Sequence, residues 1–195
     1  MLKTKVYLQS LGCRLNQSEI DVVARQFVEA GHIVVNEPRQ ADVCVLNTCA
    51  VTAEAERKSR RRIRALARIN PVARIAVVGC YGTLAAESCA ALPGVEWVVS
   101  NENKDEVVEI VGKGEASRAR DASTSDSLPD RPRPCGRTRA FVKVQDGCDN
   151  HCTYCIVRLL RGPSRSRPSA EVVSEVQSRA EDGYQEAVLT GVNLG

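Results

Sequence analysis

The stretch 42-DVCVLNTC-49 contains the pattern that decides the fold of this 195-residue chain. It is a continuous apolar run, as expected for a strand buried on both faces, and it ends at Asn47, Thr48 and Cys49. The same arrangement recurs in 7-YLQSLGC-13 and in 75-IAVVGC-80. An apolar strand followed directly by cysteine is therefore a repeated feature of the first half of the chain.

Helical patterns separate these apolar strands. We expect strands at 6–8, 33–35, 42–46, 74–78 and 95–99, and helices through 20–28, 54–69, 84–92 and 104–111. Asn16 or Ser18 is the expected N-cap of the first helix. Strands that alternate with helices at this spacing predict an α/β fold of Rossmann-like type, with a parallel sheet covered on both faces.

The composition restricts the class of protein. The chain has 9 cysteines, a net charge of +3 and 43% hydrophobic residues, which argues against a wholly disordered chain. It has no run of 18 apolar residues and no signal-peptide core at its N-terminus, so we expect no membrane association and a cytoplasmic location. Because thiols are kept reduced there, the cysteines indicate a metal site or catalysis before disulfides.

Two domains are expected, joined by a linker. Residues 112–138 are rich in Ser, Pro, Arg and Asp, and this composition predicts the linker. The N-terminal domain then covers 1–111, and the start of a second domain covers 139–195. In the second domain we expect a strand at 140–144, a helix capped by Ser169 and a strand at 186–190.

Cys13, Cys49 and Cys80 are predicted to meet in space although they are far apart in sequence. The carboxyl ends of parallel strands lie along one edge of a sheet, where ligands bind in such folds. Gly12 and Gly79 precede two of these cysteines and let the backbone approach a bulky ligand. Three thiolates with an open fourth position favour an iron–sulfur cluster, and they suit a catalytic zinc ion less well. The alternative is that the three cysteines are buried core thiols without a metal.

Three other cysteines have different expected roles. Cys44 lies inside an apolar strand and Cys89 inside a helix of small residues, so both are predicted to be core thiols. Cys135 lies in the linker and is predicted to be an exposed thiol without a ligand role.

A second group of cysteines, Cys148, Cys152 and Cys155, follows the strand at 140–144 in the string DGCDNHCTYC. Thiolates at this spacing can bind three corners of a [4Fe–4S] cube and leave one iron free. A structural zinc site usually has two pairs of ligands, and no second pair is nearby. His151 as a zinc ligand, or Cys135 as a fourth cluster ligand, is the less favoured alternative.

The CxxxCxxC spacing, with Tyr154 before the last cysteine, resembles the radical S-adenosylmethionine (SAM) enzymes. The whole chain is most similar to one branch of them, the methylthiotransferase family, through LGCRLNQSE, VLNTCAVTAEAERKSRRRIR, VVGCYG, VKVQDGCDNHCTYCIV, RGPSRSRP and VLTGVNLG. VLNTCAVT, DGCDNHCTYC and LTGVNLG look most like the members that act on threonylcarbamoyladenosine in tRNA. After CIV the family usually has a Pro-Tyr-type stretch, where this chain has Arg158, Leu159 and Leu160.

The resemblance implies an architecture that this chain contains only in part. Family members join an N-terminal α/β domain with three cluster cysteines to a radical SAM (β/α) partial barrel and an RNA-binding TRAM domain. This chain has one helix and two strands of the barrel and no TRAM domain. We therefore expect a truncated chain that is inactive alone.

The resemblance also implies cofactors and site residues. Cys148, Cys152 and Cys155 would hold a [4Fe–4S] cluster whose free iron binds SAM, and Cys13, Cys49 and Cys80 would hold an auxiliary [4Fe–4S] cluster that carries sulfur. Tyr154 would lie near the adenine of SAM, and Gly191 and Asn193 would contact SAM. No catalytic residue is expected beyond the cluster ligands. The implied partners are tRNA and an electron donor of flavodoxin or ferredoxin type.

The implied activity is the transfer of a methylthio group to C2 of N6-threonylcarbamoyladenosine next to the anticodon of tRNA. One alternative is a methylthiotransferase for isopentenyl-adenosine tRNA or for ribosomal protein S12. A different class of alternative is a non-enzymatic module that binds zinc or RNA.

Basic residues are concentrated in two segments. Residues 56–68 have seven basic side chains, which predicts either phosphate contacts with tRNA or a solvated helix face. Residues 129–168 have nine basic and three acidic side chains, and these include Arg131, Arg133, Arg137, Arg139, Arg165 and Arg167.

Overall fold

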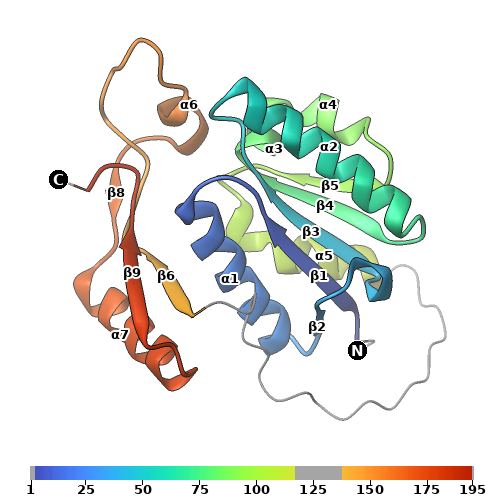
Figure 1. Ribbon diagram of the computed structural model, residues 1–195, viewed down its shortest axis with the longest axis horizontal. Coiled ribbons are helices and arrows are strands. Elements are labelled where there is room, and N and C mark those ends of the chain that lie inside the picture. Colours follow the sequence, from blue (N-terminus) through green and yellow to red (C-terminus); the bar gives the residue numbers. More distant parts are fainter. Residues whose placement is uncertain (1–2, 117–137, 195) are drawn as a thin grey trace.

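The computed structural model describes residues 3–116 and 138–194, and its N-terminal part is built on a five-stranded sheet (Figure 1). The strands lie in the order β2-β1-β3-β4-β5, and every neighbouring pair is parallel. Their bounds are β1 (Lys5–Ser10), β2 (Ile33–Val35), β3 (Val43–Thr48), β4 (Arg74–Gly79) and β5 (Val95–Val99). The predicted α/β fold with a parallel sheet is confirmed.

Helices cover both faces of this sheet, as Figure 1 shows. One face carries α1 (Arg14–Glu29) and α5 (Val107–Ala116), and the other carries α2 (Ala53–Ile69), α3 (Cys80–Leu84) and α4 (Ala86–Ala90). Two 3₁₀ turns, η1 (Pro38–Gln40) and η2 (Lys104–Glu106), lie in the connections. Among the described residues, no helix is both long and apolar enough to cross a membrane.

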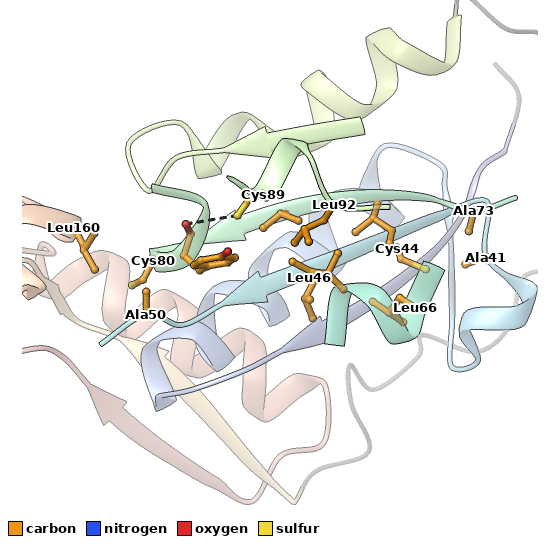
Figure 2. Packing of buried hydrophobic residues seen from close by; sticks show 14 residues of the cluster. Ala41, Cys44, Leu46, Ala50, Leu66, Ala73, Cys80, Cys89, Leu92 and Leu160 are labelled. Carbon is orange, nitrogen blue, oxygen red and sulfur yellow. Dashed lines mark hydrogen bonds between the residues drawn. The ribbon is translucent and has the colours of Figure 1, made fainter. Parts of the chain in front are cut away.

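Strand β3 is the centre of the core, because all six of its residues are buried. Its side chains alternate between the two layers. Cys44 and Leu46 pack with α2, whereas Val43 and Val45 pack under α1 and α5. Figure 2 shows the first of these layers, which extends along the sheet from Ala41 and Ala73 to Cys80.

The second part of the chain forms a parallel βαβ unit, the repeating unit of a β/α barrel. Strands β6 (Arg139–Lys143) and β9 (Glu186–Thr190) pair in parallel and are connected through α7 (Ser169–Glu181). Between β6 and α7 the chain forms β7 (Gln145–Asp146), α6 (Val157–Arg161) and β8 (Arg165–Ser166), and β7 pairs antiparallel with β8. Helix α1 contacts β6, so it lies between the sheet and this unit.

Two predicted helix caps are wrong. Helix α1 begins at Arg14, immediately after Cys13, so Asn16 and Ser18 lie inside it. Both are buried, and their side chains bond other parts of the chain instead of the helix terminus. Helix α7 begins at Ser169 itself, after an N-cap at Pro168, and the Ser169 side chain makes no cap hydrogen bond.

Two predicted helices have different bounds. The helix expected at 84–92 is the pair α3 and α4, which are separated at Ala85, where the backbone leaves the helical region (φ −139°, ψ 54°). The helix expected at 104–111 starts as the turn η2 and continues to Ala116, so it extends into the segment expected to be linker. Cys135, Arg131, Arg133 and Arg137 lie outside the described residues.

Candidate metal centre

Cys13, Cys49 and Cys80, called the first triad below, follow β1, β3 and β4, which are neighbours in the sheet. Cys49 and Cys80 are 6% and 2% exposed, and Cys13 is exposed. Burial raises the pKa of Cys49, and the nearby thiols of Cys80 and Cys13 raise that pKa further. The structure therefore brings these three thiols within electrostatic range at one edge of the sheet.

Two glycines make this close approach possible. Gly12 has a φ of +96°, and a Cβ at this position would lie 2.5 Å from the Cβ of Cys49. Gly79 has a φ of +90°, and a Cβ there would overlap with the side chain of Asn47. Only glycine combines this backbone conformation with this lack of space, so the turns before Cys13 and Cys80 depend on it.

Two buried asparagines contact the first triad. The Sγ of Cys13 lies 3.6 Å from the Oδ1 of Asn16, and the Nδ2 of Asn16 donates to the carbonyls of Leu11 and Thr48. The Nδ2 of Asn101 lies 3.7 Å from the Sγ of Cys80. Both asparagines thus connect a thiol to a fixed part of the backbone.

Cys148, Cys152 and Cys155, called the second triad below, lie in the loop between β7 and α6. Cys148 is half-buried, and its N–H donates to the carbonyl of Gly162 at 3.1 Å, while Cys152 and Cys155 are exposed. Tyr154 is 90% exposed. His151 is exposed, and its Nδ1 lies 2.9 Å from the Nη1 of Arg158. A loop with little packing of its own therefore carries this triad.

Gln145 connects the base of this loop to the end of β9. Its Nε2 donates to the carbonyls of Asp146 and Gly147, and its Oε1 accepts from the N–H groups of Val192 and Asn193 at 2.8 and 3.0 Å. The segment 191–193 is therefore held beside the residues that precede Cys148. The role of Gly191 and Asn193 in binding SAM stays a prediction.

A cavity of about 310 Å³ lies between the first triad and the end of β9. It is lined by Cys13, Arg14, Leu15, Leu189, Thr190, Gly191 and Leu194. One cysteine of the first triad and one predicted SAM-binding residue, Gly191, thus share the same space.

The chemistry of the donors fits iron–sulfur clusters. Within the described ranges, no group of three or more His, Cys, Asp or Glu side chains is arranged to hold a metal ion. Thiolates around a zinc ion all lie about 2.3 Å from one atom, whereas the cysteines of a [4Fe–4S] cluster bind different irons and stand further apart. Three thiols at a glycine-lined edge suit such a cluster, and the assignment of the six cysteines as ligands stays a prediction.

A buried ion cluster lies beside the first triad, and no sequence motif predicted it. It consists of Glu19, Lys104, Lys143, Asp146 and Arg161. The Nη1 of Arg161 lies 2.9 Å from carboxylate oxygens of both Glu19 and Asp146. The sequence does contain one indication of this cluster, because Glu19 lies directly before Ile20 on the apolar face of α1. Its ion-pair partners are up to 142 positions away in sequence.

The electrostatics of this ion cluster keep its carboxylates charged. Burial alone would raise the pKa of Glu19, but Lys104, Arg161 and Lys143 lower that pKa to about 2. The same balance holds the pKa of Asp146 well below its usual range. For Arg161, burial opposes the charged form, but Glu19 and Asp146 outweigh it and raise the pKa of the guanidinium.

Cys44 and Cys89 are core thiols, as predicted. Both have no exposed surface, and burial raises the pKa of each to about 11. The Sγ of Cys89 lies 3.7 Å from the carbonyl of Tyr81, the contact drawn in Figure 2.

Helix α2 begins four residues after Cys49 and displays basic side chains. Arg60 and Arg62 have roles within the protein, because Arg60 lies over the ring of Tyr81 and Arg62 contacts Tyr7. The exposed basic side chains of the helix are Arg57, Lys58, Arg61, Arg64 and Arg68. We call these five residues the α2 basic surface.

The fold and the site define a class of protein: an α/β domain with a cysteine triad at its sheet edge, joined to a βαβ unit with a second cysteine triad. Residues 5–100 match the model of the Uncharacterized protein family UPF0004. The chain is 39% identical over 191 residues to the threonylcarbamoyladenosine tRNA methylthiotransferase MtaB of Chlamydia pneumoniae. This alignment covers 96% of this chain and 43% of the relative. It is 36% identical over 197 residues to MtaB of Bacillus subtilis, covering 97% and 44%.

A third relative has a different substrate in its name. The tRNA-2-methylthio-N(6)-dimethylallyladenosine synthase of Thermodesulfovibrio yellowstonii is 32% identical over 197 residues, covering 97% of this chain and 45% of the relative. The chain is therefore similar over almost its whole length to methylthiotransferases, with 35–39% identity to three relatives named MtaB. It spans less than half the length of these curated relatives.

Proposed function

We propose that this chain is part of a radical SAM methylthiotransferase that transfers a methylthio group to C2 of N6-threonylcarbamoyladenosine in tRNA, next to the anticodon. The observation that carries the proposal is the meeting of Cys13, Cys49 and Cys80 at one sheet edge, beside a second region with a CxxxCxxC loop. The MtaB relatives, at 35–39% identity, support this nucleoside.

The residues have distinct roles in this proposal. The second triad would hold the [4Fe–4S] cluster that binds SAM, with Tyr154, Gly191 and Asn193 on the SAM side. The first triad would hold an auxiliary [4Fe–4S] cluster. When bound, these groups supply the one-electron and sulfur chemistry that an unactivated C–H bond requires, because amino-acid side chains alone do not provide it.

The residues of the chain itself position these groups. Gln145 holds segment 191–193 against the base of the second triad. Gly12 and Gly79 leave room at the first triad. In this proposal, the cavity lined by Cys13 and Gly191 would be the place where both regions meet a substrate.

The substrate is tested by mass spectrometry of tRNA nucleosides from cells with and without the gene. Loss of the 2-methylthio form of threonylcarbamoyladenosine, restored by the complete gene, is the expected result. Loss of the 2-methylthio form of isopentenyl-adenosine, or of the modification of ribosomal protein S12, would establish one of the alternative substrates instead.

We further propose that the 195-residue chain alone does not cleave SAM. Among the described residues of the second region there is one βαβ unit, and Leu189 of β9 is half-exposed, so few side chains are available to enclose SAM. Formation of 5′-deoxyadenosine from SAM by the reconstituted chain would refute this. Zinc in place of iron after anaerobic purification would instead favour the non-enzymatic zinc- or RNA-binding alternative.

The proposed partners are tRNA and an electron donor of flavodoxin or ferredoxin type, in the cytoplasm. For tRNA, the α2 basic surface offers charges that can bind phosphates next to the first triad. A double charge reversal, Arg61→Glu with Arg64→Glu, should weaken tRNA binding and reduce the slope of log K against log salt by about 0.7–0.9 per lost contact. Arg39→Glu, on an exposed arginine of η1, is the control and should change neither the affinity nor the slope.

A further inference from the structure

Helix α6 follows the second triad in sequence but packs into the N-terminal domain. Leu160 is 5% exposed and belongs to the same apolar cluster as Ala50 and Cys80. Figure 2 shows these three side chains next to one another at the end of the cluster. The residues that leave the loop of the second triad are therefore fixed at the first triad.

Two consecutive residues of α6 each reach a cysteine of the first triad through one asparagine. The carbonyl of Leu160 accepts from the Nδ2 of Asn101 at 2.8 Å, and this nitrogen lies 3.7 Å from the Sγ of Cys80. The Nη2 of Arg161 donates to the Oδ1 of Asn16 at 2.7 Å, and this oxygen lies 3.6 Å from the Sγ of Cys13. These contacts place the guanidinium of Arg161 one side chain away from the first triad.

Among the described residues that its ion pairs join, the cluster around Arg161 has one more cation than carboxylate. It contains three cations, Lys104, Lys143 and Arg161, and two carboxylates, Glu19 and Asp146. The side chain of Arg161 is 3% exposed, so water screens its charge poorly. A guanidinium stays protonated in proteins, and this charge acts on the thiols of Cys80 and Cys49.

We infer that Arg161 is a positioning residue that sets the reduction potential of the iron–sulfur cluster held by the first triad, by fixing a positive charge beside it. The inference rests on the proposed function, because the first triad must hold a cluster. Reduction adds one electron and makes the cluster more negative, so a fixed positive charge favours the reduced state and raises the potential. Arg161 lies in the helix that follows the second triad, so the second region contributes to the electronic properties of the first.

The test is a redox titration, monitored by electron paramagnetic resonance, of the 195-residue chain with Cys148, Cys152 and Cys155 changed to Ala. Only the first triad can then bind a cluster after anaerobic reconstitution with iron and sulfide. Arg161→Gln should lower the midpoint potential, because it leaves two lysines opposite two carboxylates and no excess charge. A change of about tenfold in the ratio of reduced to oxidised cluster is expected, which is about 59 mV for one electron.

The control is Arg25→Gln, which also removes an arginine that joins α1 to the second region. Arg25 contacts Glu175 at 3.4 Å, in α7, and makes no contact with the first triad or with Arg161. This variant should keep the parental potential, and Arg161→Lys, which retains the charge, should stay close to it. Equal potentials for the parent, Arg161→Gln and Arg25→Gln would overturn the inference.

A variant that fails to bind iron does not end the test. If Arg161→Gln binds no cluster, Lys143→Gln removes one charge from the same ion cluster at a side chain that is 22% exposed. A lower potential in that variant supports the inference, and an unchanged potential refutes it. If the parent binds no iron, both the proposed function and the inference are refuted. If it binds iron but the midpoint potential does not change in the variants, only the inference is refuted.

Discussion

The two cysteine triads differ in what holds them. Each cysteine of the first triad follows a strand of one continuous sheet, and Cys49 and Cys80 are almost fully buried. The second triad lies in a loop, with Cys152 and Cys155 exposed. The first arrangement therefore exists before any ligand binds, because the sheet fixes it. The second depends on few contacts, chiefly those of Gly162 and Gln145, and we expect its ligand to complete its order.

This difference also shows which element joins the two regions. Helix α6 leaves the loop of the second triad and inserts Leu160 into the core around Cys80, while Arg161 enters the buried ion cluster. The first triad is thus in contact with the chain that carries the second triad.

The largest effect is expected at the turn before Cys80. Gly79→Ala should destabilise the protein by about 4 kcal/mol, because the new Cβ overlaps with Asn47 at a positive φ. Gly162 lies in the turn that supports the second triad, and its φ is +73°, but the space around a new Cβ is open. Gly162→Ala should therefore destabilise the protein by only about 1–2 kcal/mol. Urea denaturation measures both. Equal losses for the two variants would show that the sheet does not fix the first triad.

The ion cluster between the regions should make stability depend on pH. The folded pKa of Glu19 is about 2, below its ordinary value of 4.5, so its contribution is complete above that value and disappears as the pH falls toward 2. Glu19→Gln should lose about 3 kcal/mol at pH 7 and show a flatter decline between pH 5 and 3. The exposed Glu54→Gln is the control. A decline in the Glu19→Gln variant as steep as in the parent would contradict this role.

Thiol reactivity should separate the loop from the core. Burial raises the pKa of Cys44 and of Cys89 to about 11, against an ordinary value of 9.0, so their thiolate fraction is lower by about a hundredfold even before burial blocks the reagent. In the cluster-free protein, mass spectrometry after brief alkylation should find the exposed Cys13, Cys152 and Cys155 labelled before Cys44 and Cys89. Early labelling of Cys44 or Cys89 in the folded chain would show that the core is open.

The smallest effect is expected at the helix caps. The Oγ1 of Thr52 accepts from the N–H of Ala55 at 3.1 Å and caps α2, so Thr52→Ala should cost about 1 kcal/mol. Ser169 makes no such bond, and Ser169→Ala should change stability by less than about 0.5 kcal/mol. Thermal unfolding of both variants measures this. A larger loss of stability for Ser169→Ala would show that Ser169 does cap α7.

The sequence predicted the features that follow from local pattern and sheet geometry. Apolar strands that alternate with helices determine a parallel sheet, and the carboxyl ends of its neighbouring strands share one edge, so the meeting of Cys13, Cys49 and Cys80 could be foreseen. Cys44 and Cys89 could be assigned to the core for the same reason, since they lie within apolar elements.

The ion cluster and the helix starts could not be predicted in this way. Glu19 and Arg161 meet only because α1 packs between the sheet and the second region, and sequence spacing does not determine that packing. Asn16 and Ser18 are good N-cap residues in isolation. Here Asn16 bonds the backbone beside the first triad and Ser18 bonds Lys143, so tertiary contacts override the local preference.

The iron content of the chain tests whether each triad holds a cluster of its own. After anaerobic reconstitution with iron and sulfide, the account predicts about eight irons per parent chain and about four in each triple variant, Cys13→Ala/Cys49→Ala/Cys80→Ala or Cys148→Ala/Cys152→Ala/Cys155→Ala. The variant that lacks all six cysteines should bind none. About four irons in the parent, unchanged when the first triad is removed, would contradict the claim that the sheet edge holds a cluster of its own.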